Sequence, residues 1–101
     1  MDESTVGRLR EQAEPLAALS VSHLSEATRQ KLLRDELSVN AYPTDDGGFV
    51  YVGARYDIPT EVDLAAIFEL AERAGVVWLK FDAHSAVIDG LAVFDEPGAV
   101  A

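Results

Sequence analysis

The stretch "LSVNAYPTDDGGFVYVG", residues 37–53, decides the predicted fold because two strand-like segments flank a cluster of turn-forming residues. In residues 37–42 apolar side chains alternate with polar ones, which is the period of a half-buried strand. Residues 43–48 supply Pro, Asp and Gly, and residues 49–53 resume the strand pattern. The stretch therefore predicts a β-hairpin over residues 37–53, with the glycines forming the turn.

Helices and further strands are predicted on both sides of this hairpin. Ser25 is a good N-cap for a first helix that runs to residue 36, and Thr60 is predicted to cap a second helix that Gly75 ends. On the second helix we expect Glu61 on the exposed arc and Val62 in the buried stripe. Three further strands are predicted: "LAALSVS" at 16–22, "VVWLKF" at 76–81 and "LAVFD" at 91–95.

The predicted order is β-α-β-β-α-β-β, which favours an α+β fold. We expect a split β-α-β (ferredoxin-like) sheet of four to five strands with two helices on one face. Residues 1–15 are predicted to be a flexible N-terminal tail, residues 16–96 a single α+β domain, and residues 97–101 a C-terminal tail. The other face of the sheet is then left without a helix.

The charge of the chain narrows the class of partner. The 101 residues carry a formal charge of −10, and eleven of the 18 acidic residues lie in residues 37–101. Such a field repels a phosphate backbone, so we expect no direct binding of nucleic acid, whereas a protein with a basic surface is attracted. The alternative is that the acidic residues only increase solubility.

Composition also excludes several kinds of site and location. The chain has no cysteine, which rules out disulfides and thiolate chemistry. Its first residues lack the apolar core of a signal peptide, and no apolar run approaches the ~20 residues of a membrane span. We therefore expect a cytoplasmic protein that does not bind membranes.

The segment "GGFVYV", residues 47–52, partly matches the RNA-reading strand of an RNA-recognition motif. The match fails where that motif needs a basic residue and a stacking aromatic, because Asp45 and Gly47 stand there. RNA binding is therefore not predicted.

The chain holds few groups that could carry catalysis or bind a metal. Asp45 and Asp46 are expected to be turn residues, because two adjacent aspartates do not surround a cation. The loop after the 76–81 strand holds Asp82, His84 and Asp89, in which His84 could act as a general base, although no nucleophile motif accompanies it. We expect no enzyme activity, no catalytic residue, no cofactor and no metal, and a structural role for His23.

A protein-interaction surface is the remaining prediction. Aromatic side chains are expected on the uncovered sheet face with acidic residues at its margin, the composition that interfaces favour. The alternative is that the aromatic residues belong to the core or cap the sheet edges. The predicted partner-binding residues are Tyr42, Asp45, Asp46, Tyr51, Asp57, Trp78 and Asp82.

Four segments together carry a resemblance to a known family. They are "SHLSEATRQKL", "LSVNAYPTDDGGFVYV", "DIPTEVDLAAIFELAERAG" and "VVWLKFDAHSAVIDGLAVFD", within residues 20–96. The chain resembles a family of small uncharacterised acidic proteins of bacterial plasmids, integrative elements and prophages. The resemblance implies no active-site residues. It implies a context in which such proteins inhibit host defence, as anti-CRISPR proteins or as DNA mimics against restriction enzymes.

The leading hypothesis is a non-enzymatic acidic protein-binding module that inhibits a nucleic-acid-handling host defence complex, such as a nuclease or CRISPR effector. One alternative is a self-associating module that forms a homodimer through the open sheet face or an edge strand. Another is a small metal-dependent enzyme that uses Asp82, His84 and Asp89.

Overall fold

The computed structural model describes residues 3–53 and 58–94. These residues form an α+β fold, which confirms the predicted class. In chain order the elements are α1 (Glu3–Gln12), β1 (Leu16–Ser20), the 3-10 helix η1 (Val21–His23), α2 (Glu26–Leu33), β2 (Ala41–Thr44), β3 (Gly47–Tyr51), α3 (Val62–Ala74) and β4 (Trp78–Asp82).

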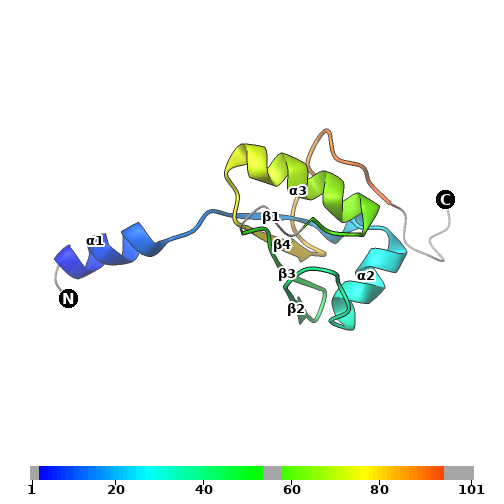
Figure 1. Cartoon of the computed structure of the whole chain (residues 1–101), viewed down its shortest axis with the longest axis horizontal. Coiled ribbons are helices and arrows are strands. Elements are labelled where there is room, and N and C mark those ends of the chain that lie inside the picture. The colour runs from blue at the N-terminus through cyan, green and yellow to red at the C-terminus, as the bar shows by residue number, and fades with distance from the viewer. Residues whose placement is uncertain (1–2, 54–57, 95–101) are drawn as a thin grey trace.

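The four strands form one mixed sheet in the order β1-β4-β3-β2. β1 is parallel to β4, whereas β3 is antiparallel to both β4 and β2. β1 and β2, which precede and follow α2 in the chain, lie at opposite edges with β4 and β3 between them (Figure 1). This separation is compatible with the predicted split β-α-β arrangement of the ferredoxin-like type.

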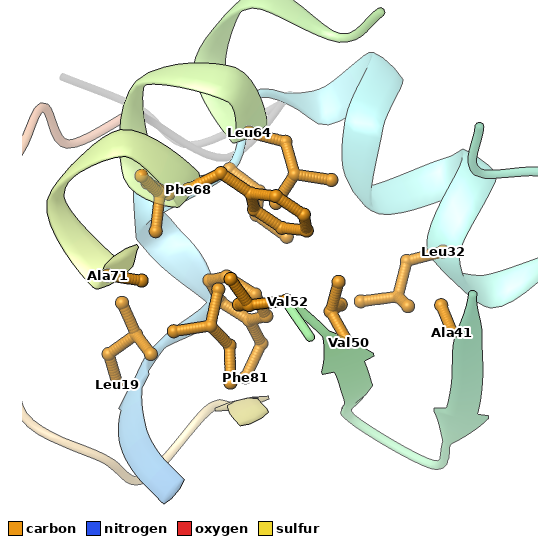
Figure 2. Packing of buried hydrophobic residues seen from close by; sticks show 12 residues of the cluster. Leu19, Leu32, Ala41, Val50, Val52, Leu64, Phe68, Ala71 and Phe81 are labelled. Atoms are coloured by element: carbon orange, nitrogen blue, oxygen red, sulfur yellow. The ribbon is translucent and has the colours of Figure 1, made fainter. Parts of the chain in front are cut away.

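The hydrophobic core lies between α2, α3 and one face of the sheet (Figure 2). Leu64 and Phe68 of α3 and Leu32 of α2 point toward Val50 and Phe81 of the sheet. The side chains of a strand point alternately to the two faces of the sheet. The α2 and α3 residues all point toward Val50 and Phe81, so both helices cover the same face. The residues next to Val50 and Phe81 in β3 and β4 therefore point to the other face, which α2 and α3 leave uncovered.

Local signals set the start of α2 and the end of α3. The Ser25 hydroxyl accepts a hydrogen bond from the Thr28 backbone N–H at 3.4 Å, which confirms Ser25 as the N-cap of α2. Gly75 ends α3 with a φ of 77°, a left-handed conformation that glycine adopts without steric cost. Both ends were predictable because each depends on residues close in the sequence.

Several predicted strand boundaries need correction, among them the strand expected at 76–81, which lies at Trp78–Asp82. The strand expected at 37–42 lies at Ala41–Thr44, and the first strand ends at Ser20 because η1 follows it. The strand expected at 91–95 is absent from residues 91–94, and residue 95 lies outside the described residues. Residues 92 and 94 are instead held by side chains: His23 Nδ1 donates to the Ala92 carbonyl at 2.7 Å, and the Arg29 guanidinium donates to the Phe94 carbonyl at 3.4 Å.

The predicted turn of the hairpin is also wrong in its details. Thr44 pairs with Gly47, so Asp45 and Asp46 alone form the turn, and Gly47 and Gly48 belong to β3. Both glycines are buried, and their role is close packing against neighbouring elements instead of an unusual backbone angle.

The start of α3 differs from the prediction as well. Glu61, not Thr60, is the N-cap residue, and its side chain makes no capping hydrogen bond. Glu61 is buried, with 7% of its surface exposed, whereas Val62 is 85% exposed, which reverses the prediction for both residues. The reason is that the Glu61 carboxylate turns inward to bind the segment before β2: it accepts hydrogen bonds from the Ser38 hydroxyl at 2.6 Å and the Ser38 N–H at 3.2 Å.

The helix α1 projects away from the rest of the molecule (Figure 1) and buries none of its residues. It gives the molecule extents of 54 × 29 × 27 Å. Within residues 3–53 and 58–94, no helix is long and apolar enough to cross a membrane.

Candidate functional site

The outer face of the sheet, defined here as the sheet surface turned away from α2 and α3, gathers most of the predicted partner-binding residues. The strand register places Leu16, Trp78 and Tyr51 in one row across β1, β4 and β3. The next row holds Ala18, Lys80, Phe49 and Tyr42. Because these positions alternate with core residues, all of them belong to the outer face.

Tyr42, Tyr51 and Trp78 form an aromatic cluster on this face. The Trp78 and Tyr51 ring centroids lie 4.8 Å apart with the planes tilted by 55°, and the Trp78 and Tyr42 centroids lie 6.1 Å apart with a tilt of 40°. Tyr42 is 58% exposed, and neighbouring Leu16 is 48% exposed. The three rings therefore lie together on the uncovered face.

A carboxylate from the chain before β1 lies at the edge of this cluster. The Trp78 indole N–H donates a hydrogen bond to Glu14 Oε1 at 3.0 Å. Glu14 was not among the predicted site residues, because 64 positions separate it from Trp78 and only the β1·β4 pairing brings them together. The aromatic cluster thus has an acidic neighbour that sequence patterns did not reveal.

Lys80 lies in the next row, and its ammonium group interacts with other side chains of the same protein. Its ammonium lies 6.0 Å from the centre of the Phe49 ring and 3.6 Å from Asp82 Oδ2. An ammonium over an aromatic ring is attracted by the negative face of the ring. The outer face therefore already contains one set of cation, ring and carboxylate.

Asp82 holds the turn that follows β4. Its Oδ1 accepts the backbone N–H groups of His84 at 2.8 Å and Ser85 at 2.6 Å, and its Oδ2 accepts the Ser85 hydroxyl at 2.9 Å. The hydrogen bond from the Ser85 hydroxyl, the backbone N–H groups and nearby Lys80 lower the pKa of Asp82 against the opposing effect of burial. Asp82 thus bonds the His84 backbone and does not orient its imidazole.

The turn aspartates lie at one end of the sheet, where Asp46 borders the outer face and both residues border a hollow beside α2. Asp46 Oδ2 accepts the Ala83 N–H at 3.3 Å, and Asp45 is exposed. Asp57 lies outside the described residues. A shallow hollow of about 470 Å³ at this end is lined by Thr44, Asp46, Phe49, Lys80, Asp82, His84 and Ser85.

The three residues of the metal or enzyme hypothesis are not gathered into one site. Asp82 and His84 line the hollow at the outer face, whereas Asp89 borders an apolar groove beside α3. In the part of the chain that the structure describes, no group of three or more His, Asp or Glu side chains could hold a metal ion.

Comparison with known proteins assigns the family. The sequence profile described as "Family of unknown function (DUF5983) C-terminal domain" matches residues 16–96, from the first residue of β1 to beyond β4. The chain belongs to this family. No curated protein and no solved structure matches it. All elements of the sheet and its two covering helices lie within the DUF5983 domain, and α1 lies before it.

Two buried basic side chains hold the last segment of the DUF5983 domain, and only one of them was predicted to be structural. His23 is 1% exposed and uses both ring nitrogens: Nδ1 donates to the Ala92 carbonyl, and Nε2 accepts the Ile88 N–H at 2.8 Å. This confirms the expected structural role of His23. The structural role of buried Arg29 was not predicted. Nothing in the sequence of α2 indicates that the Arg29 side chain reaches the Phe94 carbonyl.

A second hollow of the DUF5983 domain is apolar. About 440 Å³ of space lies between α3, β1 and residues 88–91, with Ile67, Leu70 and Ile88 among its lining residues. Asp89 is the one charged residue on its lining, which offers little to orient a ligand. The outer face, with its aromatic cluster and charged groups, is therefore the stronger candidate site.

Proposed function

We propose that this DUF5983 domain is a non-enzymatic protein-binding module whose outer face docks a partner with a basic surface. The observation that carries the proposal is that α2 and α3 cover one face of the sheet, while the opposite face holds the cluster of Tyr42, Tyr51 and Trp78.

Exposed aromatic side chains support docking because they supply most of the binding energy in protein interfaces. Tyr and Trp are enriched among the residues whose removal costs the most affinity, and such residues lie at the centre of an interface. Tyr42 is the most exposed of the three, so a partner that covers the cluster removes the most surface from water there.

The charge of the chain supports a basic partner. The formal charge is −10, Glu14 borders the aromatic cluster, and Asp46 and Asp82 line the hollow at the end of the outer face. Opposite charges on two surfaces accelerate their encounter and exclude partners of like charge. The same field opposes a bare phosphate backbone.

The resemblance to proteins of plasmids and prophages suggests the class of partner. Nucleases and CRISPR effectors carry basic surfaces, and we propose that the module inhibits a nucleic-acid-handling protein of this kind by occupying such a surface. DNA mimicry requires carboxylates at phosphate-like spacing. The centre of the outer face is aromatic and includes Lys80, so the proposal is aromatic docking with an acidic margin.

The test combines capture of a partner with matched variants. Bound proteins from a bacterial host are identified by mass spectrometry, and the affinity of the identified partner is then measured with Tyr42→Ser and Leu70→Ser. Leu70 is 44% exposed on α3, away from the outer face, and serves as the control. We expect Tyr42→Ser to weaken binding at least tenfold and Leu70→Ser to leave it unchanged.

Charge is tested on the same partner. Asp45→Asn with Asp46→Asn should weaken binding, and affinity should fall between about 50 and 300 mM salt, because screening shortens the reach of the acidic margin. The matched control is Glu69→Gln with Glu72→Gln on the exposed side of α3. Salt-insensitive binding that Tyr42→Ser does not change would refute the proposal.

Self-association through the same face is the competing outcome. Sedimentation over a range of concentrations distinguishes it, because a dimer formed through the outer face doubles in mass and returns to a monomer in Tyr42→Ser. A dimer of this kind would replace the foreign partner with a second copy of the chain.

A further inference from the structure

We infer that the aromatic cluster of Tyr42, Tyr51 and Trp78, together with Glu14, receives the guanidinium group of an arginine side chain from the partner. This inference rests on the proposed function, since it names the group on the partner that the outer face recognises.

The first support is the geometry of the cluster. A cation interacts with an aromatic ring within about 6 Å of its centroid. The Tyr51 and Tyr42 centroids lie 4.8 Å and 6.1 Å from that of Trp78, so a group that contacts the indole lies close to a tyrosine ring as well. A cation over the indole is therefore within reach of a second ring.

The second support is the carboxylate at the indole edge. Glu14 Oε1 accepts the Trp78 indole N–H, and in the described part of the chain no donor bonds its Oε2. A guanidinium group is planar, stacks on aromatic faces and donates to carboxylates at its edges. Stacked on Trp78, it can donate to Glu14 at the same time.

The third support is the neighbouring set on the same face. Lys80 lies over the Phe49 ring and beside Asp82, so the chain's own lysine fills that combination of ring and carboxylate. Trp78 and Glu14 form a second pair of aromatic ring and carboxylate, one row away on the same face. The cation–aromatic contact recorded on the outer face is that of Lys80 with Phe49, which leaves the Trp78 and Glu14 combination without a cation from residues 3–53 and 58–94.

Arginine fits this site better than lysine or a nucleobase. The guanidinium is more weakly hydrated than an ammonium and matches the flat indole face. A stacked base would bring its phosphates into the field of a chain with a charge of −10.

Trp78 itself reports the binding, because it is the only tryptophan of the chain. The full chain is titrated with the peptide acetyl-Gly-Arg-Gly-Arg-Gly-amide, and with the same peptide carrying citrulline, which has the shape of arginine without its charge. We expect a saturable change in Trp78 fluorescence with the arginine peptide, at least tenfold weaker binding of the citrulline peptide, and about threefold weaker binding of a lysine peptide.

Matched variants separate ring chemistry from general attraction. Tyr42→Phe keeps the ring and should keep the affinity, whereas Tyr42→Leu keeps apolar volume and should weaken binding about fivefold. Glu14→Gln should weaken it several-fold, and Glu69→Gln, the same charge change on α3, should not. Circular dichroism of each variant checks that the fold is retained.

Equal binding of the arginine and citrulline peptides, or equal effects of Glu14→Gln and Glu69→Gln, would overturn the inference. If Tyr42→Ser abolishes capture of the partner while the two peptides bind equally, the proposed function stands and the arginine site fails. If capture does not depend on Tyr42, the proposed function itself fails.

Discussion

Gly47 lies where β3 approaches the backbone of β4. A Cβ atom at this position would collide with the Phe81 carbonyl, and at Gly48 it would stand 2.8 Å from Leu32 Cδ1 of α2. Neither clash involves a positive φ, so the need for glycine here is steric. The hairpin can join the sheet and the core because both positions lack a side chain.

Replacing Gly47 with alanine should therefore destabilise the domain. The added methyl group meets backbone that can yield only by distorting the β3·β4 pairing, and overpacking of this kind costs about 1–3 kcal/mol. Urea unfolding followed by Trp78 fluorescence measures the loss.

Gly7→Ala is the matched control for this substitution. A Cβ atom at Gly7 meets nothing within 4 Å, and the residue lies in α1. Its unfolding midpoint should stay that of the native chain. A Gly47→Ala variant as stable as Gly7→Ala would show that β3 tolerates a side chain at this position.

At the scale of elements, α3 supports the N-terminal end of α2, which Ser25 caps. Asp63 Oδ2 accepts the Ser25 N–H at 2.8 Å, and Oδ1 accepts the Thr28 hydroxyl at 2.8 Å. Burial alone would raise the pKa of Asp63, but the hydrogen bonds from Ser25 and Thr28 outweigh it and lower the pKa below its ordinary value. The charged carboxylate therefore joins two helices that are far apart in the sequence.

Asp63→Asn should lower stability by about 1–2 kcal/mol at pH 7, because the neutral amide keeps only one accepting oxygen and its NH2 group cannot replace the other, so one of the two hydrogen bonds is lost. Because the pKa is lower in the folded state, the stabilisation is full above the ordinary value of 3.8 and is lost as the pH falls through the folded-state pKa. Urea unfolding of both proteins at pH 7, 5, 4 and 2.5 measures the difference, which should shrink below pH 4.

Glu69→Gln provides the comparison on the exposed side of α3, where removing a carboxylate should change stability little at any of these pH values. A difference between Asp63→Asn and the native chain that is as large at pH 2.5 as at pH 7 would contradict a role for the charged carboxylate.

Elements whose ends depend on nearby residues were predictable, and those that depend on distant partners were not. Ser25 and Gly75 mark helix ends through local hydrogen bonds and backbone angles. The predicted strand over residues 37–42 has the right apolar alternation, because Leu37 and Val39 do pack against the core. Ser38 in that segment binds Glu61 instead of a neighbouring strand, and no local pattern reveals a partner 23 positions away.

The same distinction applies to the candidate site. Period-two alternation made Tyr42, Tyr51 and Trp78 candidates for the uncovered face, and the strand register places them there. The role of Asp82 as acceptor for the turn after β4, and the contact of Glu14 with Trp78, depend on the three-dimensional path of the chain.

At the scale of the whole molecule, α1 lies apart from the body, meaning the sheet together with α2 and α3. Its residues are not buried, and the family match begins at residue 16, after α1. The first residue of the body that reaches the outer face is Glu14, which bonds Trp78. The stability of the body should therefore be independent of residues 1–12.

Removal of residues 1–12 should leave the free energy of unfolding within about 0.5 kcal/mol of that of the full chain. Urea unfolding measures it, and the Trp78 emission of the folded state should be unchanged because Glu14 is retained. Removal of residues 1–14 is the contrasting variant, since it deletes the acceptor of the indole N–H and should shift the emission. A large loss of stability on removing residues 1–12 would contradict this prediction and show that α1 stabilises the domain.

The central position of β4 has a consequence for synthesis of the chain. Among the strands of residues 3–53 and 58–94, β4 is the last to be translated, and it pairs with both β1 and β3. Until about residue 82 has left the ribosome, β1 lacks its partner strand, the hairpin has an open edge, and the apolar side of α3 lacks much of its packing surface. We therefore expect the domain to fold late and as a unit, and a chain that stops before β4 to be bound by chaperones or degraded by proteases.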